Sequence, residues 1–247
     1  MDSFSFHVEP FSEDLTGRLS WGVMGNTLLR VAEKAAIRHG FGFSTVHEQN
    51  AAWVLSRLLI EMERMPQSGE AFQVDTWVSR IYRQFTDRLY RISDAQGNTL
   101  GHAHSVWALI NLDTRLPINL EEIDNPGFHA AMDTGTIPID GFSRNKLRPQ
   151  GSPQREIEVV QSDLDINGHV NSIRYMQMAI DSLYLAYGDA LSPRTNIPTR
   201  VEMTYAAETF YGDKLSVFTE AVSAHDYHVL LTRADATPVV RAVAKFL

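Results

Sequence analysis

The sequence predicts an α+β protein made of two copies of one unit, in which a helix precedes an antiparallel sheet. Three observations support this prediction. The two halves of the 247-residue chain resemble each other weakly at one constant offset. Each half contains an amphipathic helical pattern, and each pattern is followed by strand-like segments that turn residues separate.

The internal repeat is a single alignment of the two halves. Asn26 aligns with His169, and the same offset applies without a gap along both copies. It pairs identical residues at several positions: Gly25 with Gly168, Ala36 with Ala179, Gly69 with Gly212, and Val74 with Val217. Self-similarity over this length indicates two copies of one structural unit.

The first copy, residues 1–112, is expected to form one domain. A helix is expected at residues 25–39, because apolar residues recur there at three- and four-residue spacing. These residues are Leu28, Val31, Ala32, Ala35 and Ala36. Strands are expected at residues 53–63, 71–80, 85–93 and 100–111, with turn residues at 94–98.

The second copy, residues 152–247, repeats this order. Its helical stripe consists of Val170, Ile173, Met176, Ile180, Leu183 and Tyr187, and the helix is expected to end near Gly188. Strands are expected at residues 199–208, 214–222, 227–234 and 238–247. Residues 113–151 are rich in Pro, Gly and Asp, and we expect a linker there that crosses from one sheet to the other.

The composition narrows the classes of function. A formal net charge of -8 and a pI of about 5.6 make nucleic acid an unsuitable main partner. The absence of cysteine excludes disulfides, thiolate zinc sites and a cysteine nucleophile. The first residues lack the pattern of a secretory signal, and no apolar run is long enough for a membrane span. We therefore expect a cytoplasmic protein.

A polar motif precedes the second helix. Asp165, Asn167 and His169 lie two residues apart, so they can converge on a turning segment but not on a regular helix. Gly168 gives the backbone freedom for a sharp turn. The backbone N–H groups of Gly168 and His169, expected near the helix start, could stabilise an oxyanion.

The first copy lacks these polar groups. At the aligned positions it has Gly22, Met24 and Asn26. This contrast suggests one catalytic half and one binding half. Asp and Asn before a helix are also common caps, so the motif alone is more typical of a structural role than of a catalytic one. His102 and His104 could bind a metal from one face of a strand, but no third ligand is evident, and we expect no metal site.

Three stretches of the sequence resemble the acyl-ACP thioesterases of plant plastids and their bacterial relatives. They are residues 53–66 with 74–78, residues 105–111 with Thr114-Arg115, and residues 163–171, which match that family's D-L-D-x-N-x-H-V-N segment. Thr204-Tyr205, leading to Glu208, extends the resemblance over nearly the whole chain.

The resemblance implies a double hot-dog fold, with two tandem hot-dog units, that hydrolyses fatty acyl-ACP without a cofactor. The family's catalytic residues carry over to Asp165, Asn167, His169 and Glu208. Thr209 stands where plant members usually have cysteine, and Ala206 and Ala207 stand where they usually have arginines. The first departure argues against a thiol mechanism, and the second leaves the local charge open.

The contrast between the two copies also predicts where the substrate binds. The acyl chain is expected in the first half, where the helix start is apolar around Trp21, Val23 and Met24, although these residues could equally form core. The partner is expected to be acyl carrier protein, which is acidic. Two basic clusters are candidate docking surfaces or ordinary solvated faces: Arg144, Lys146, Arg148 and Arg155, and Arg80, Arg83, Arg88 and Arg91.

Three other functions remain open at this point: an acyl-CoA thioesterase on the same fold, a hot-dog dehydratase, and a non-catalytic acyl-binding module. The set of polar residues in the second copy favours the acyl-ACP thioesterase. The chain could be a monomer, because its two copies can pair with each other, or a homodimer.

Overall fold

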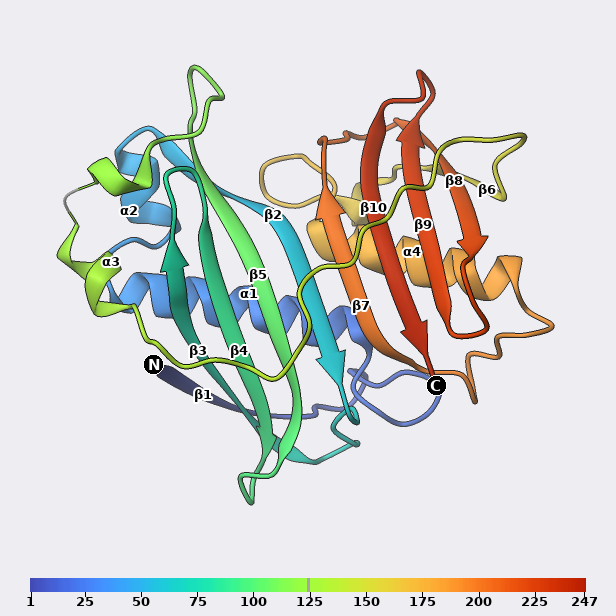
Figure 1. The fold of residues 1–247 in the computed structure, drawn as a ribbon, viewed down its shortest axis with the longest axis horizontal. Helices are drawn as coiled ribbons and strands as arrows, with labels where there is room; N and C mark the ends of the chain where they lie inside the picture. The colour runs from blue at the N-terminus through green and yellow to red at the C-terminus, as the bar shows by residue number, and fades with distance from the viewer. Residues whose placement is uncertain (124) are drawn as a thin grey trace. The chain divides into compact units, whose positions relative to one another are not determined.

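Two units make up the chain, Met1–Asp140 (unit 1) and Gly141–Leu247 (unit 2). The computed structural model describes residues 1–123 and 125–247 (Figure 1). The segment expected as a linker, residues 113–151, is divided between the units at Asp140 and Gly141. No helix in the described part of the chain is long and apolar enough to cross a membrane.

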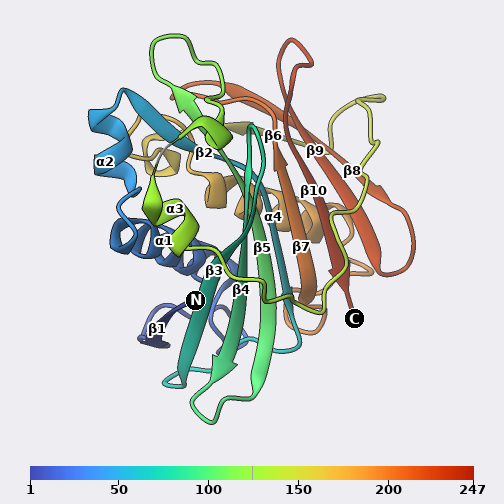
Figure 2. The ribbon, with the colours of Figure 1, turned by 60° about the vertical axis from the view of Figure 1, so that its left-hand side comes forward.

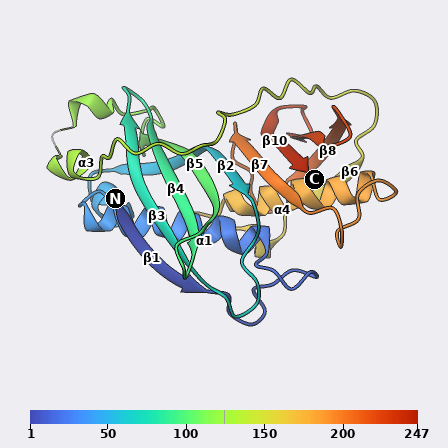
Figure 3. The ribbon, with the colours of Figure 1, turned by 60° about the horizontal axis from the view of Figure 1, so that its bottom comes forward.

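Unit 1 is an antiparallel sheet with a long helix against one face (Figure 3). Its strands, in sheet order, are β1 (Asp2–His7), β3 (Ala71–Ile81), β4 (Thr86–Asp94), β5 (Thr99–Asn111) and β2 (Ala51–Met62). The helix against the sheet is α1 (Trp21–Arg38). Shorter helical elements are α2 (Phe43–Glu48), the 3-10 turn η1 (Leu120–Glu122) and α3 (Pro126–Ala130), visible at one end of the unit in Figure 2.

Helix α1 begins earlier than the apolar stripe alone indicates. Ser20 is its N-cap, and the Ser20 hydroxyl accepts a hydrogen bond from the Val23 N–H at 3.3 Å. The predicted stripe is buried against the sheet, with Leu28, Val31 and Ala35 fully inaccessible to solvent. Burial of this stripe, rather than intrinsic propensity, is the main source of helix stability here.

Unit 2 repeats the plan with a shorter helix. Its strands, in sheet order, are β7 (Pro198–Tyr205), β10 (Pro238–Phe246), β9 (Asp226–Arg233), β8 (Lys214–Ala221) and β6 (Arg155–Glu158). The 3-10 turn η2 (Gln161–Asp163) precedes α4 (Ser172–Ala186), which contacts β7, β8, β9 and β10. β7 ends at Tyr205, so Glu208 lies beyond the strand that was expected to contain it.

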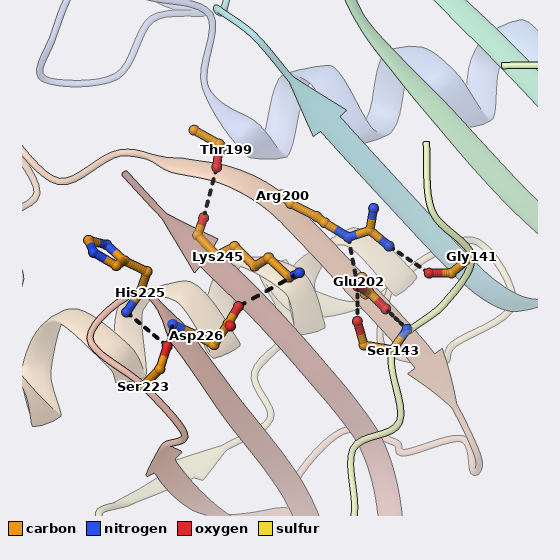
Figure 4. Close-up of polar contacts among 9 residues, drawn as sticks. All are labelled: Gly141, Ser143, Thr199, Arg200, Glu202, Ser223, His225, Asp226 and Lys245. Carbon is orange, nitrogen blue, oxygen red and sulfur yellow. Dashed lines mark hydrogen bonds and ion pairs between the residues drawn. The ribbon is translucent and has the colours of Figure 1, made fainter. Parts of the chain in front are cut away.

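The start of unit 2 is fixed on its own sheet by buried charges (Figure 4). On β7, Arg200 Nε lies 2.7 Å from Glu202 Oε1, and both side chains are buried. The Ser143 N–H donates to Glu202 Oε2 at 2.6 Å, and the guanidinium of Arg200 donates to the Gly141 carbonyl at 2.7 Å. Each of these two buried charges therefore has a partner within unit 2, as a buried charge requires.

Candidate active site

Asp165 organises the loop between η2 and α4. Its Oδ1 accepts the N–H of Asn167 at 2.8 Å and the N–H of His169 at 3.3 Å. The Gly168 N–H donates to the Asp165 carbonyl at 3.1 Å, and the Asp165 N–H donates to the His169 carbonyl at 2.8 Å. Gly168 has φ +78°, a conformation that other residues rarely adopt. The motif is therefore a closed turn around one carboxylate.

Both ends of this turn are anchored. The buried carboxylate of Asp163 accepts two hydrogen bonds from Arg174 of α4, at 2.7 and 3.0 Å. Asp163 also accepts the Asn171 N–H through its carbonyl at 2.9 Å. Asn171 is the N-cap of α4, because its side chain accepts the Ile173 N–H at 2.8 Å. The motif of residues 163–171 was expected immediately before the second helix, and α4 begins directly after it, at Ser172.

His169 and Glu208 are brought together from different parts of the sequence. His169 Nδ1 lies 3.5 Å from Glu208 Oε1, and the side chains are 25% and 38% exposed. This separation is longer than a good hydrogen bond but within reach of one on a small side-chain movement. The ring of Phe210 packs edge-on against the imidazole with 5.1 Å between centroids. The pair thus has an aromatic ring on one side, and both of its side chains keep part of their surface exposed.

A buried contact holds the Glu208 segment on α4. The Val170 N–H donates to the Thr209 carbonyl at 3.0 Å, and the hydroxyls of Tyr175 and Thr209 lie 2.6 Å apart. Both side chains are buried, and burial raises the pKa of the Tyr175 phenol. The Tyr175 phenol therefore ionises only at higher pH than a phenol in water.

Arg233 belongs to this neighbourhood and was not anticipated from the sequence. It ends β9, and its guanidinium donates to the backbone carbonyl of Glu208. Its Nε atom is buried without a hydrogen-bond partner among the described residues. In a single sequence, an arginine before a turn does not indicate a place in a functional site. Only the fold shows that Arg233 contacts the backbone of Glu208.

The structure brings Asp165, His169 and Glu208 into one site, and it leaves Asn167 exposed at the tip of the turn. The backbone N–H groups of Gly168 and His169, expected to face an oxyanion, both donate to Asp165. This arrangement provides an imidazole and a carboxylate for proton transfer and an exposed carboxamide as a hydrogen-bond donor.

The residues expected to bind the acyl chain lie on the first turn of α1. Trp21 and Met24 are buried and Val23 is half-buried. The indole N–H of Trp21 is buried without a hydrogen-bond partner within the described chain. An apolar pocket of unit 1 lies along later turns of the same helix, from Leu29 to Ala36, and these three residues do not line it.

The basic clusters differ in exposure. In unit 2, the segment Arg144 to Arg148 is held on the sheet through Asn145, which donates to the carbonyls of Val229 and Ala242 at 3.0 and 2.8 Å. The alternating residues Arg144, Lys146 and Arg148 are exposed and line an open groove. In unit 1, the second expected surface cluster was wrong in part, because Arg88 is buried and Arg91 is paired with Asp75 at 2.6 Å.

His102 and His104 do not form part of a metal cluster in the described residues, where no group of three or more potential ligands occurs. His104 Nε2 instead lies 3.2 Å from Asp87 Oδ1. The contact with Asp87 gives His104 a structural role that needs no metal.

Comparison with protein families matches both halves of the chain. Residues 3–124 match the acyl-ACP thioesterase N-terminal domain, and residues 148–238 match the acyl-ACP thioesterase C-terminal domain. The chloroplastic acyl-[acyl-carrier-protein] hydrolase FATB3 of Cuphea viscosissima is 27% identical over 71% of this chain and 49% of its own length. The chloroplastic palmitoyl-acyl carrier protein thioesterase of Gossypium hirsutum is 29% identical over 63% and 41%. The chain thus spans about half the length of the curated relatives it matches.

Solved structures match the chain over its whole length. An acyl-ACP thioesterase from Bacteroides thetaiotaomicron is 40% identical, with a TM-score of 0.90, covering 100% of this chain and 97% of that one. The 12:0-ACP thioesterase from Umbellularia californica is 17% identical with a TM-score of 0.83, covering 100% and 96%, which bears on the fold alone. These matches confirm the expected fold class, α+β with two tandem hot-dog units.

Proposed function

Because this chain belongs to the acyl-ACP thioesterase family, we propose that it hydrolyses the thioester of fatty acyl-ACP to a free fatty acid and holo-ACP. The observation that carries the proposal is the pairing of His169 with Glu208 beside the Asp165 turn in unit 2. The relatives' names give the substrate class, an acyl chain on acyl carrier protein.

In the proposed mechanism, the His169–Glu208 pair activates a water molecule. The pair accepts a proton as the water oxygen adds to the thioester carbonyl carbon, and it returns that proton to the departing sulfur. Their present 3.5 Å separation leaves His169 able to shift toward water or toward Glu208. Asp165 acts as a positioning residue, because its Oδ1 is occupied by backbone N–H groups.

The carbonyl oxygen of the substrate needs a hydrogen-bond donor as negative charge develops on it. We assign this role to the side chain of Asn167, which is exposed at the tip of the turn. The N–H groups of Gly168 and His169 could contribute only after release from Asp165, since both donate to it.

The decisive experiment measures hydrolysis of a panel of acyl-ACPs and the matching acyl-CoAs by wild type, His169→Ala and Glu208→Gln. We expect both variants to lose about a hundredfold or more in kcat. Glu9→Gln is the matched control, because His7 and Glu9 form an exposed His–Glu pair at 3.1 Å in unit 1. Near wild-type turnover by folded His169→Ala would refute the assignment.

The same panel separates the remaining functions. A higher kcat/KM for acyl-CoA than for acyl-ACP would keep the site and change the substrate carrier. Acyl binding without turnover of either substrate would leave a binding module and refute the hydrolase.

Carrier protein docking is assigned to the exposed cations Arg144, Lys146 and Arg148, because an acidic partner is attracted to a basic groove. Arg148→Glu is expected to raise KM for acyl-ACP about tenfold and leave acyl-CoA hydrolysis unchanged. Arg194→Glu, an exposed arginine on the loop before β7, is the control. Equal effects of the two charge reversals on KM would contradict this placement.

A further inference from the structure

An apolar pocket opens in unit 1 between α1, the inner face of the sheet and α3. Its main lining residues are Leu29, Ala32, Phe41, Trp53, Trp107 and Phe128. Its empty space, counted together with the solvent at its open mouth, is about 430 Å³.

The aromatic walls of this pocket are fixed in place. The Trp53 indole donates to the Phe41 carbonyl at 2.9 Å, and the Trp107 indole donates to Ser105 Oγ at 2.7 Å. Phe41 stacks on Phe128 with 4.5 Å between ring centroids. Because the polar edges of both indoles are satisfied inside the protein, their remaining surface serves as a preformed apolar wall.

Two charged side chains line this apolar pocket, Glu33 and Arg88, and only Arg88 lies on the sheet. Arg88 lies on β4, where Thr86, Arg88 and Tyr90 are buried on one face of the strand and Arg91 is exposed on the other. Arg88 is only 4% exposed. Its guanidinium stays charged in proteins, so the sheet carries a buried cation on its inner face.

Among the described residues, Arg88 has a hydrogen-bond partner but no ion-pair partner. Nη1 donates to Thr76 Oγ1 at 3.2 Å, and that hydroxyl donates in turn to the Leu89 carbonyl at 3.0 Å. In residues 1–123 and 125–247, no carboxylate lies within ion-pair distance of Arg88, and Asp2 and Glu33 act on it only at longer range. Burial accordingly lowers the pKa of this guanidinium.

Two other arginines of this chain, one buried and one half-exposed, each have a carboxylate partner, unlike Arg88. The buried Arg200 has Glu202 at 2.7 Å, and the half-exposed Arg91 has Asp75 at 2.6 Å. Glu33 also lines the pocket, but its Oε1 accepts the Phe43 N–H at 2.9 Å. Buried charges are normally paired, so an anion is the group that would complete this site.

We propose that this pocket binds an apolar chain that ends in a carboxylate, with the guanidinium of Arg88 as its hydrogen-bond and charge partner. Two sources supply this chemistry. One is a free fatty acid, the product of the proposed reaction, held with its carboxylate at Arg88. The other is an acyl substrate with a second carboxylate at its far end, and this source rests on the proposed function.

The first arm of the test is direct binding, which requires no turnover. Decanoate and decanol are titrated into the protein, and the intrinsic tryptophan fluorescence, to which the pocket residues Trp53 and Trp107 contribute, is followed, with calorimetry as a second readout. Wild type is expected to bind decanoate roughly tenfold more tightly than decanol, because only the acid forms a charge-assisted hydrogen bond with Arg88.

The variants isolate the charge from the shape of the pocket. Arg88→Met is expected to remove the preference for the acid while retaining decanol binding, which shows that the pocket is intact. Arg88→Lys is expected to keep part of the preference. Arg91→Met, on the opposite face of the same strand, is the matched control and should bind like wild type. If Arg88→Met fails to fold, the Arg88→Lys comparison still decides the role of the guanidinium.

The second arm compares hydrolysis of decanoyl-ACP with that of the ω-carboxy analogue of the same length. If the free acid shows no preference over the alcohol, but Arg88→Met selectively loses the ω-carboxy substrate, the anion comes from the substrate chain. If neither arm depends on Arg88, the proposal is overturned. Failure of hydrolysis alone refutes the proposed function and leaves the binding arm as the test of the pocket.

Discussion

The buried hydroxyl pair of Tyr175 and Thr209 connects the stability of unit 2 to the geometry of its site. The two oxygens lie 2.6 Å apart, and Thr209 directly follows Glu208 in the sequence. Tyr175→Phe leaves the Thr209 hydroxyl buried without this partner. An orphaned buried hydroxyl costs about 1–3 kcal/mol, whereas removing both hydroxyls is nearly neutral.

We therefore expect Tyr175→Phe and the nearly isosteric Thr209→Val each to lower the free energy of unfolding by about 1–2 kcal/mol. The double variant is expected to lose less than the sum, with a coupling of about 1 kcal/mol. Urea denaturation of all four proteins measures this cycle. Turnover of acyl-ACP should fall several-fold in Tyr175→Phe, because a displaced Glu208 no longer lies opposite His169.

Two results would refute this reasoning. Additive losses in the double variant would mean that the hydroxyls are not energetically coupled. Unchanged turnover in a destabilised Tyr175→Phe would mean that the contact supports the fold but does not position Glu208.

Three further predictions concern charge, backbone and pH. Gly168→Ala is expected to lower the free energy of unfolding by about 1 kcal/mol, because φ +78° is strained for alanine although the added Cβ meets no atom within 4 Å. Thermal denaturation measures this loss. Gly141→Ala is the control, because Gly141 is equally unobstructed and has an ordinary φ, so no loss is expected. Arg88→Met is expected to raise the free energy of unfolding by about 1 kcal/mol or more, since it removes a buried charge that has no ion-pair partner in the described part of the chain. A lower Tm would show that the cation supports the fold. Burial raises the pKa of Asp75, but hydrogen bonds from Ser3, Arg91 and Gln73 outweigh it, so the pKa lies below 3.8. This carboxylate therefore stabilises the fold above about pH 4, and its contribution is lost as the pH falls through its folded pKa. On acidification, Asp75→Asn should lose less stability than wild type. Urea midpoints that fall in parallel with pH for the two proteins would contradict this.

The sequence predicts the secondary structure of this chain best where one side of an element is apolar. The stripe from Leu28 to Ala36 locates α1, and the stripe from Ile173 to Leu183 locates α4, because burial of a continuous face determines a helix. The helix starts depend on caps instead. Ser20 and Asn171 each accept one N–H with a side-chain oxygen, and either residue alone resembles an ordinary polar position in the sequence.

The candidate site was located by its motif, but its geometry depends on contacts distant in sequence. His169 and Glu208 come from different elements, and their proximity results from the pairing of residues 169 and 210. Arg88 was wrongly placed in a surface cluster, because arginines are usually exposed and a short strand with apolar residues on both faces does not show which face is buried. A single sequence contains neither type of information.

The internal repeat explains how one half acquires a polar site. At the constant offset that aligns Asn26 with His169, the residues matching the turn 164–171 are 21–28, and these form the first turns of α1. The same positions in unit 2 are not helical, because the carboxylate of Asp165 takes the N–H groups of Asn167 and His169. A side chain that binds nearby backbone donors competes with the helix. Unit 1 has Gly22 at the position of Asp165, so nothing there opposes the helix. The polar site therefore exists because the start of the second helix is unwound, and the carboxylate that unwinds it also fixes the position of His169.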